Sequence, residues 1–238
     1  MRGAPALRCY ARAILVPVVL AALSAGAVAQ ATASLSVDSN YRFRGVSLSE
    51  SRPSVQLFLN YDTASGWYAG AAATQVEPAR GDRYVWLLGY AGYVTAVAEG
   101  HRFEFGASYS HFTGDSGHDF AEPYVGVLFE HWSLRLHYAP DYFGRHVRTA
   151  YLDTSAQRPL TDHLRLFAHI GVLAPLSRQA VIGNDANRVR ADLRVGAGWA
   201  SDGWDLRVAW VAASSGGPYP ALYGGPRSAW LVGASYSF

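Results

Sequence analysis

Hydrophobic and polar residues alternate along most of the chain after residue 30. In the stretch 188–199, apolar side chains occupy every second position from Val189 to Trp199, and charged residues or glycines lie between them. Successive side chains of a β-strand point to opposite faces, so this stretch predicts a strand with one apolar and one charged face. On a helix the same apolar residues would be scattered around the axis. The pattern therefore predicts strands.

Twelve such segments are expected, each close to the roughly 9–11 residues with which a tilted strand crosses a bilayer. Their spans are 33–44, 53–61, 67–76, 83–93, 101–110, 121–130, 132–139, 147–156, 163–172, 188–199, 204–213 and 228–238. The phase is clear in most of them, but both parities carry apolar residues in 67–76, 83–93 and 147–156. The predicted fold class is all-β: a transmembrane antiparallel up-and-down β-barrel of about 12 strands.

The connections between these segments alternate in length. Stretches such as 157–162 and 201–203 are short, whereas 45–52, 140–146 and 173–187 are longer and rich in Gly, Pro, Asp and Ser. Outer-membrane barrels have short periplasmic turns and longer external loops, so all the longer connections are expected outside. The connection 94–100 is long for a periplasmic turn. Aromatic residues at the segment ends fit the two girdles that flank the apolar band of such a barrel.

The first 29 residues have the layout of a cleaved secretory signal. Arg2, Arg8 and Arg12 form a basic leader, residues 13–23 are almost wholly apolar, and Ala27-Val28-Ala29 offers small residues to a signal peptidase. The apolar run is too short for an uncleaved anchor, which is the less favoured alternative. The predicted domains are a signal peptide at 1–29 and an outer-membrane β-barrel domain at 30–238, exported through the general secretory pathway to the bacterial cell outer membrane.

The composition of the mature chain excludes several classes of protein. Cys9 lies in the signal, so no cysteine remains for a disulfide or thiol catalysis. Without the signal, 17 arginines face 18 acidic residues, and this balance gives no basic footprint for nucleic acid. A secreted soluble β-sandwich also alternates, but it has no reason to place Trp and Tyr at both strand ends.

The polar face of the strands, which faces the lumen, is rich in arginine. The pore-lining candidates are Arg42, Arg44, Arg102, Glu104, Arg135, His137, Arg165, His169, Arg190, Asp192, Arg194 and Arg207. Arginine keeps its charge, so an excess of arginine in a narrow polar tube attracts anions. The equally weighted alternative is that the arginines pair with inward acids and only fill the barrel.

No catalytic or metal site is expected. Ser110 and His111 are adjacent, so they point to opposite faces of a strand. Ser133 and His137 share a face but lie about 13 Å apart along the strand. The inward histidines show no metal-ligand spacing.

Four short stretches resemble one known family, the TorF family of porins, which are bacterial outer-membrane β-barrels. They are YRFRGVS at 41–47, GWYAG at 66–70, YAPDYFG at 138–144 and AHIG at 168–171. They fall in the expected order and span most of the mature chain. The resemblance implies an outer-membrane barrel with a channel role, and it brings no established substrate and no catalytic residues.

The sequence thus predicts a porin, not an enzyme, that admits small hydrophilic solutes by passive diffusion; a preference for anions is one of the two open interpretations of its inward arginines. Two alternatives remain open: a barrel enzyme acting on lipid, and a closed barrel with a structural or adhesive role. The expected partners are outer-membrane lipid and lipopolysaccharide, the outer-membrane assembly machinery through the C-terminal Phe238, and small solutes. No cofactor and no nucleic acid is expected.

Overall fold

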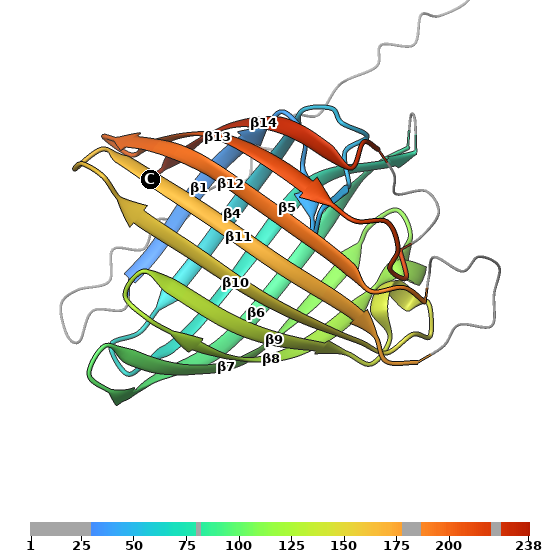
Figure 1. Ribbon diagram of the computed structural model, residues 1–238, viewed down its shortest axis with the longest axis horizontal. Helices are drawn as coiled ribbons and strands as arrows, with labels where there is room; N and C mark the ends of the chain where they lie inside the picture. Colours follow the sequence, from blue (N-terminus) through green and yellow to red (C-terminus); the bar gives the residue numbers. More distant parts are fainter. Residues whose placement is uncertain (1–29, 80–81, 178–186, 220–224) are drawn as a thin grey trace, which may run out of the picture.

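In the computed structural model, described over residues 30–79, 82–177, 187–219 and 225–238, twelve strands close into an antiparallel barrel (Figure 1). Each barrel strand pairs with the next one along the chain, and β14 pairs with β1 to close the sheet. The predicted fold class and strand number are confirmed. The predicted signal peptide at 1–29 lies outside the described residues.

The strand bounds follow the predicted segments closely. The barrel strands are β1 (Gln30–Asp38), β4 (Ser54–Asp62), β5 (Trp67–Ala79), β6 (Asp82–Ala98), β7 (His101–Phe112), β8 (Phe120–Leu128), β9 (Trp132–Ala139), β10 (Thr149–Pro159), β11 (Leu164–Pro175), β12 (Arg190–Ser201), β13 (Trp204–Ala213) and β14 (Ser228–Ser237). β9 and β13 match their predicted spans to the residue. β6 continues to Ala98, so the connection expected at 94–100 is only a two-residue turn.

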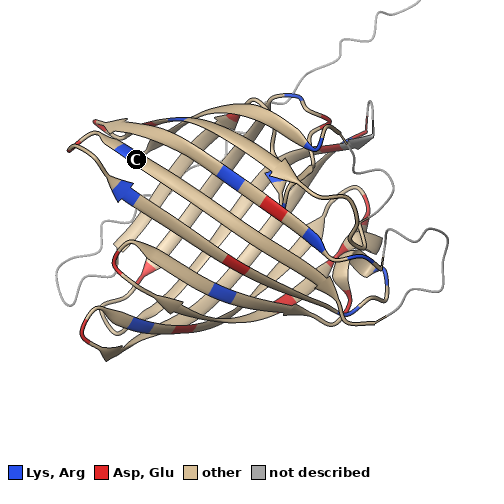
Figure 2. Cartoon of the chain, in the orientation of Figure 1, with Lys and Arg blue, Asp and Glu red and all other residues tan. Residues whose placement is uncertain are grey.

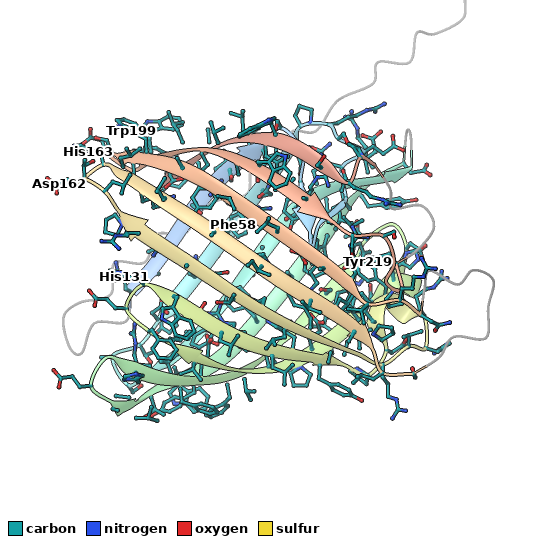
Figure 3. All side chains as sticks on the ribbon, in the orientation of Figure 1. Phe58, His131, Asp162, His163, Trp199 and Tyr219 are labelled. Atoms are coloured by element: carbon teal, nitrogen blue, oxygen red, sulfur yellow. The ribbon has the colours of Figure 1, made fainter. Side chains whose placement is uncertain are left out.

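Two short 3-10 helices interrupt the longer connections, η1 (Ser116–His118) and η2 (Tyr142–Gly144). In the part of the chain that the structure describes, no helix combines the length and apolar character needed to cross a membrane. The turns after β4, β6, β8, β10 and β12 gather at one end of the barrel, here called the short-turn end. The other end is called the long-loop end. Figure 3 places Tyr219 there, opposite Asp162, His163 and Trp199.

The outward face of the barrel is apolar. Leu57, Leu166 and Val208 lie at alternate positions of their strands, and each is more than 40% exposed. Trp199 and Trp204 lie at the short-turn end, and at the long-loop end Trp210 and Trp230 are paired across β13 and β14. A contiguous apolar belt of this extent is unusual on a water-soluble protein but matches the lipid-facing surface of a membrane barrel. The soluble β-sandwich is therefore excluded.

The connection between β1 and β4 folds into the barrel, contrary to the prediction that every longer connection lies outside. Residues 39–53, here called the plug, contain a hairpin of two short strands, β2 (Arg42–Phe43) and β3 (Val46–Ser47). Leu48 is fully buried, and the ring of Phe43 lies 4.9 Å from that of Trp86 on β6.

The prediction of a first strand at 33–44 is therefore wrong beyond Asp38. Leu35 and Val37 face outward as expected, and both are 44% exposed. Tyr41 and Phe43 continue the same alternation in sequence, but they pack against an apolar cluster inside the barrel. Alternation alone cannot separate a lipid-facing strand from a hairpin packed on an internal core.

That cluster, here called the aromatic core, fills much of the long-loop end. Its buried members are Val46, Leu48, Val76, Trp86, Phe112, Phe120, Ala139, Tyr142, Phe143, Tyr151 and Leu173. The connection 140–148 contributes to it through η2, so this loop also closes over the mouth. The aromatic core explains the ambiguous phase of 67–76, 83–93 and 147–156, because inward residues there are apolar in order to pack against the plug.

Candidate functional site

A cavity of about 730 Å³, lined by both charged and apolar side chains, lies inside the barrel between the plug and the short-turn end. Arg42 and Arg44 of the plug bound it on one side, and Arg102 and His131 line it toward the short-turn end. Two further cavities of about 340 and 360 Å³ lie beside the plug. The interior is thus divided by the plug and by inward side chains.

Charged residues are sparse on the barrel strands, and both signs occur on neighbouring strands (Figure 2). Half of the eight predicted lumenal arginines have a carboxylate partner. The ion pairs are Arg44 with Glu122 (2.8 Å), Arg135 with Glu104 (2.6 Å), Arg165 with Asp205 (2.5 Å) and Arg207 with Asp38 (3.5 Å). Pairing therefore accounts for part of the arginine excess predicted from the sequence.

The other four arginines, Arg42, Arg102, Arg190 and Arg194, have no carboxylate partner among the described residues. Arg42 donates to the backbone oxygens of Gly45 and Pro226, at 3.0 and 2.7 Å. Arg190 donates to those of Arg44 and Gly216, at 3.3 and 3.1 Å. Arg102 and Arg194 line the large cavity. These four supply positive charge to the interior that no neighbouring acid offsets directly.

Arg42 and Arg44 lie on the plug rather than on the first barrel strand, which corrects their predicted position. The Arg44 guanidinium is held by both carboxylate oxygens of Glu122, and its Cζ lies 4.0 Å from the ring centroid of Tyr151. Burial acts to lower the pKa of Arg44, but Glu122, Tyr142 and Tyr219 together outweigh it, so the pKa is raised well above its ordinary value. Arg44 therefore serves to fix the plug and is not a free pore charge.

The inward wall of β5 to β9 carries a second polar network, centred on Glu104 and Arg135. The Tyr68 hydroxyl donates to Glu104 Oε1 at 2.7 Å and lies 2.6 Å from the Tyr124 hydroxyl. A Cβ at Gly92 would lie 2.4 Å from the Tyr68 hydroxyl, so glycine leaves the room in which this ring lies across the neighbouring strand. The network is satisfied internally, which is typical of a structural element of the wall.

On β10, β11 and β12, the barrel brings together a serine, a histidine and an aspartate that were not expected to meet. Ser155 Oγ lies 2.9 Å from His169 Nδ1, and His169 Nε2 lies 3.3 Å from Asp192 Oδ1. The Tyr151 hydroxyl bridges the far side, 3.0 Å from His169 Nε2 and 3.1 Å from Asp192 Oδ2. All four side chains line the large cavity.

The sequence held a partial signal for this group. His169 and Asp192 were placed on the inward face by their parity, but Ser155 and Tyr151 fall in 147–156, where the phase was ambiguous. Glu122 was not among the predicted pore-lining residues, although the alternation along β8 places its side chain on the inward face. Cross-strand register, in which Ser155 lies opposite His169, is a property of the folded sheet.

The two inward histidines lie beside different carboxylates in the described structure. His137 lies 3.2 Å from Asp153, whereas His169 pairs with Asp192. Among the described residues, no three or more His, Cys, Asp or Glu side chains are grouped so that they could hold a metal ion. The pore-lining role of the twelve predicted residues stays a prediction, because it concerns solute passage and not position alone.

Several solved structures share this fold at low sequence identity. The NanC porin superposes with a TM-score of 0.60 and 8% identity, covering 87% of this chain and 99% of that one. The KdgM porin has also been solved in complex with disordered oligogalacturonate. It superposes with a TM-score of 0.56 and 13% identity, covering 88% of this chain and 99% of that one. LpxR from Salmonella typhimurium superposes with a TM-score of 0.52 and 11% identity, covering 87% of this chain and 99% of that one.

A comparison with curated proteins finds no match. The sequence profile of one family matches residues 22–232, and this family is described as a bacterial protein of unknown function. The match covers most of the sequence and nearly all of the barrel. The chain therefore belongs to the Gcw_chp family.

Proposed function

We propose that the protein is an outer-membrane porin through which small hydrophilic solutes diffuse, with a preference for anions. The observation that carries this proposal is the cavity of about 730 Å³ inside a closed barrel, lined in part by Arg42, Arg102 and Arg194. Each of these arginines lacks a carboxylate partner among the described residues. A fixed positive charge in a confined polar space raises the local concentration of anions.

The apolar outer face supports placement of the barrel in the bacterial outer membrane. The short-turn end then faces the periplasm and the long-loop end faces outward, as in barrels of this kind. Export by a signal peptide at 1–29 and recognition of Phe238 by the outer-membrane assembly machinery belong to the same proposal, as does contact of the belt with lipid and lipopolysaccharide. The TorF-type stretches at 41–47 and 138–144 support the porin class.

The plug sets the expected size of the channel. A twelve-stranded backbone cylinder is about 24 Å across, yet the plug and the aromatic core occupy much of its outer half. Solutes that enter from the periplasmic side reach the large cavity first and meet the plug at its far side. We therefore expect a small conductance that increases when the plug is loosened.

Planar-bilayer recording of the refolded protein tests this proposal. We expect discrete current steps, and liposome-swelling rates that are higher for galacturonate than for galactose of similar size. Oligogalacturonate is a useful larger probe, since a KdgM structure was solved in its presence. If the wild type and a plug-loosened variant both conduct nothing, the porin proposal fails and the closed structural or adhesive barrel takes its place.

A second candidate function, hydrolysis of an ester, is favoured by the Ser155–His169–Asp192 group. A serine hydroxyl within 2.9 Å of an imidazole nitrogen is placed to lose its proton to that nitrogen as it attacks a carbonyl. The carboxylate on the other side of the ring would stabilise the imidazolium that forms. The porin remains the preferred function because the large cavity inside the closed barrel carries it.

The hydrolase candidate is tested by comparing Ser155→Ala with Ser133→Ala. Ser133 lies opposite Ser155 in the register of β9 and β10 and lines the same cavity, but its hydroxyl has no histidine partner in the described structure. A hydrolase predicts that 4-nitrophenyl ester and lipid hydrolysis fall at least ~100-fold in Ser155→Ala and stay unchanged in Ser133→Ala. Equal rates in both variants and the wild type would remove this candidate.

A further inference from the structure

Two arginines without carboxylate partners lie at the junction between the plug and the barrel wall. Arg42 belongs to β2 of the plug, and Arg194 lies midway along β12 of the wall. Both line the 730 Å³ cavity, and both also line the 340 Å³ cavity beside the plug. The two guanidinium groups therefore face the same space from two separate parts of the fold.

Arg42 has a buried donor that the described protein does not satisfy. The residue is 6% exposed, and its two terminal nitrogens donate to the backbone oxygens of Gly45 and Pro226. Its Nε is buried and has no hydrogen-bond partner in the described structure. A buried cationic N–H without an acceptor is costly, so the charge of Arg42 gains from a compensating anion nearby.

The charge around Arg42 points to the sign of the missing group. Burial lowers the pKa of Arg42, and the nearby Arg190 and Arg194 lower it further by repulsion. Two acids that line these cavities are already engaged, since Asp38 accepts from Gln56 and faces Arg207, and Asp192 accepts from Tyr151 and faces His169. Three like charges around a shared space are stabilised by a counter-anion.

We propose that a small oxyanion binds between Arg42 and Arg194 and links the plug to the barrel wall. Carboxylate and phosphate oxygens match the planar fork of guanidinium donors, and Arg42 and Arg194 both line the two cavities where such an anion would lie. Because Arg42 moves with the plug and Arg194 with β12, the anion stabilises the plugged state. The site goes beyond the proposed channel, since a barrel that conducts nothing could still hold the anion.

Thermal unfolding of the refolded protein in detergent tests the site without requiring conduction. Inorganic phosphate, galacturonate and chloride are titrated at constant ionic strength and pH. We expect a saturable rise of the unfolding midpoint with an oxyanion, absent with chloride, because a ligand that binds only the folded state stabilises it by mass action. If only phosphate raises the unfolding midpoint, the ligand is a phosphate. If only galacturonate raises it, the ligand is the carboxylate of a solute.

The variants Arg194→Gln and Arg102→Gln separate a specific site from general charge. Arg102 lines the same large cavity near the short-turn end and also lacks a carboxylate partner among the described residues, so it is the matched control. We expect the oxyanion response to be lost in Arg194→Gln and kept in Arg102→Gln. Because Arg194 lies on β12 and not on the plug, the substitution Arg194→Gln leaves the sequence of the plug unchanged.

Two results would overturn the proposal: no oxyanion response in the wild type, or an equal response in Arg194→Gln. A protein that conducts but shows no oxyanion response would reject this site and leave the porin standing. A protein that shows the specific oxyanion response but no conductance would reject the porin proposal and leave the anion site standing.

Discussion

Arg44 and Glu122 join the plug to the barrel wall through two parallel hydrogen bonds of 2.8 Å, from Nη1 to Oε1 and from Nη2 to Oε2. Both side chains are 5% exposed, and the residues are 78 positions apart in the sequence. Removing one partner of a buried ion pair leaves the other charge uncompensated, which typically costs about 3–5 kcal/mol. The pair is therefore the main candidate for what holds the plug inside the barrel.

Replacing Glu122 with glutamine tests this role. We expect Glu122→Gln to lower the thermal midpoint of unfolding and to increase the single-channel conductance, since the plug loses its charged partner on β8. Glu130→Gln is the control, because Glu130 lines the same cavity but has an exposed side chain. A variant at Glu122 with wild-type midpoint and conductance would show that the pair does not hold the plug.

Gly45 provides a second, independent way to displace the plug. Its φ is +76°, and a Cβ at this position would lie 2.6 Å from the Cβ of Ala213 and 2.8 Å from that of Asp192. Alanine is strained in this conformation and would also collide with the wall, so Gly45→Ala should reproduce the effect of Glu122→Gln on conductance. Gly89→Ala should have no effect, since a Cβ there meets nothing within 4 Å.

The adjacent residues Arg194 and Val195 of β12 face the lumen and the lipid, so exchanging polar for apolar character should affect folding differently at the two positions. Val195 is 47% exposed on the apolar outer face, where an arginine near the middle of the bilayer costs about 2–4 kcal/mol. Arg194 lines the lumen, so its replacement by leucine places no charge in lipid. Folding yield into lipid vesicles should be strongly reduced for Val195→Arg and near wild type for Arg194→Leu. The reverse order would mean that the assigned faces are exchanged.

Asp119 in the connection before β8 predicts a local dependence on pH. Burial acts to raise its pKa, but hydrogen bonds from His111, the Phe112 amide and Tyr109 lower it overall. A carboxyl with a depressed pKa stabilises the fold above its unfolded pKa of about 3.9, and this contribution is lost as pH falls through the lower folded value. The hydrogen-exchange protection factors of residues 113–119, which are corrected for the intrinsic pH dependence of exchange, should therefore fall below about pH 3.9 in the wild type.

Asp119→Asn should remove that acid-dependent step. The variant lacks the titrating group, so we expect lower protection factors for residues 113–119 already at pH 6 and little further change in them on acidification. If the wild type and the variant showed the same acid-dependent acceleration, another group would be responsible.

The barrel itself could be predicted from the sequence because its two faces meet different surroundings. Where the inward face is polar, as in β9 with Arg135 and His137, the alternation specifies the strand to the residue. Where the inward face packs against the plug, as at Val76 and Trp86, both faces are apolar and the alternation disappears. Those are the stretches whose phase the sequence left open.

The candidate site was predictable only in part. Parity placed Arg190, Asp192 and Arg194 on the inward face, but it cannot show which charges are neutralised across strands. The meeting of Ser155 with His169 depends on the register of β10 and β11, and the position of Arg42 depends on a connection that folds inward. Both are long-range features, which local patterns do not encode.

The central claim, an anion-preferring lumen set by unpaired arginines, is tested most directly by the reversal potential of single-channel current in a KCl gradient. At about 0.1 M salt the Debye length is about 10 Å, so the lumenal charges influence permeating ions across much of the lumen. We predict anion selectivity in the wild type, a smaller anion preference in Arg194→Gln and an unchanged one in Ser133→Ala, which alters the same cavity wall without changing a charge. A cation-selective wild type at this salt concentration would contradict the account.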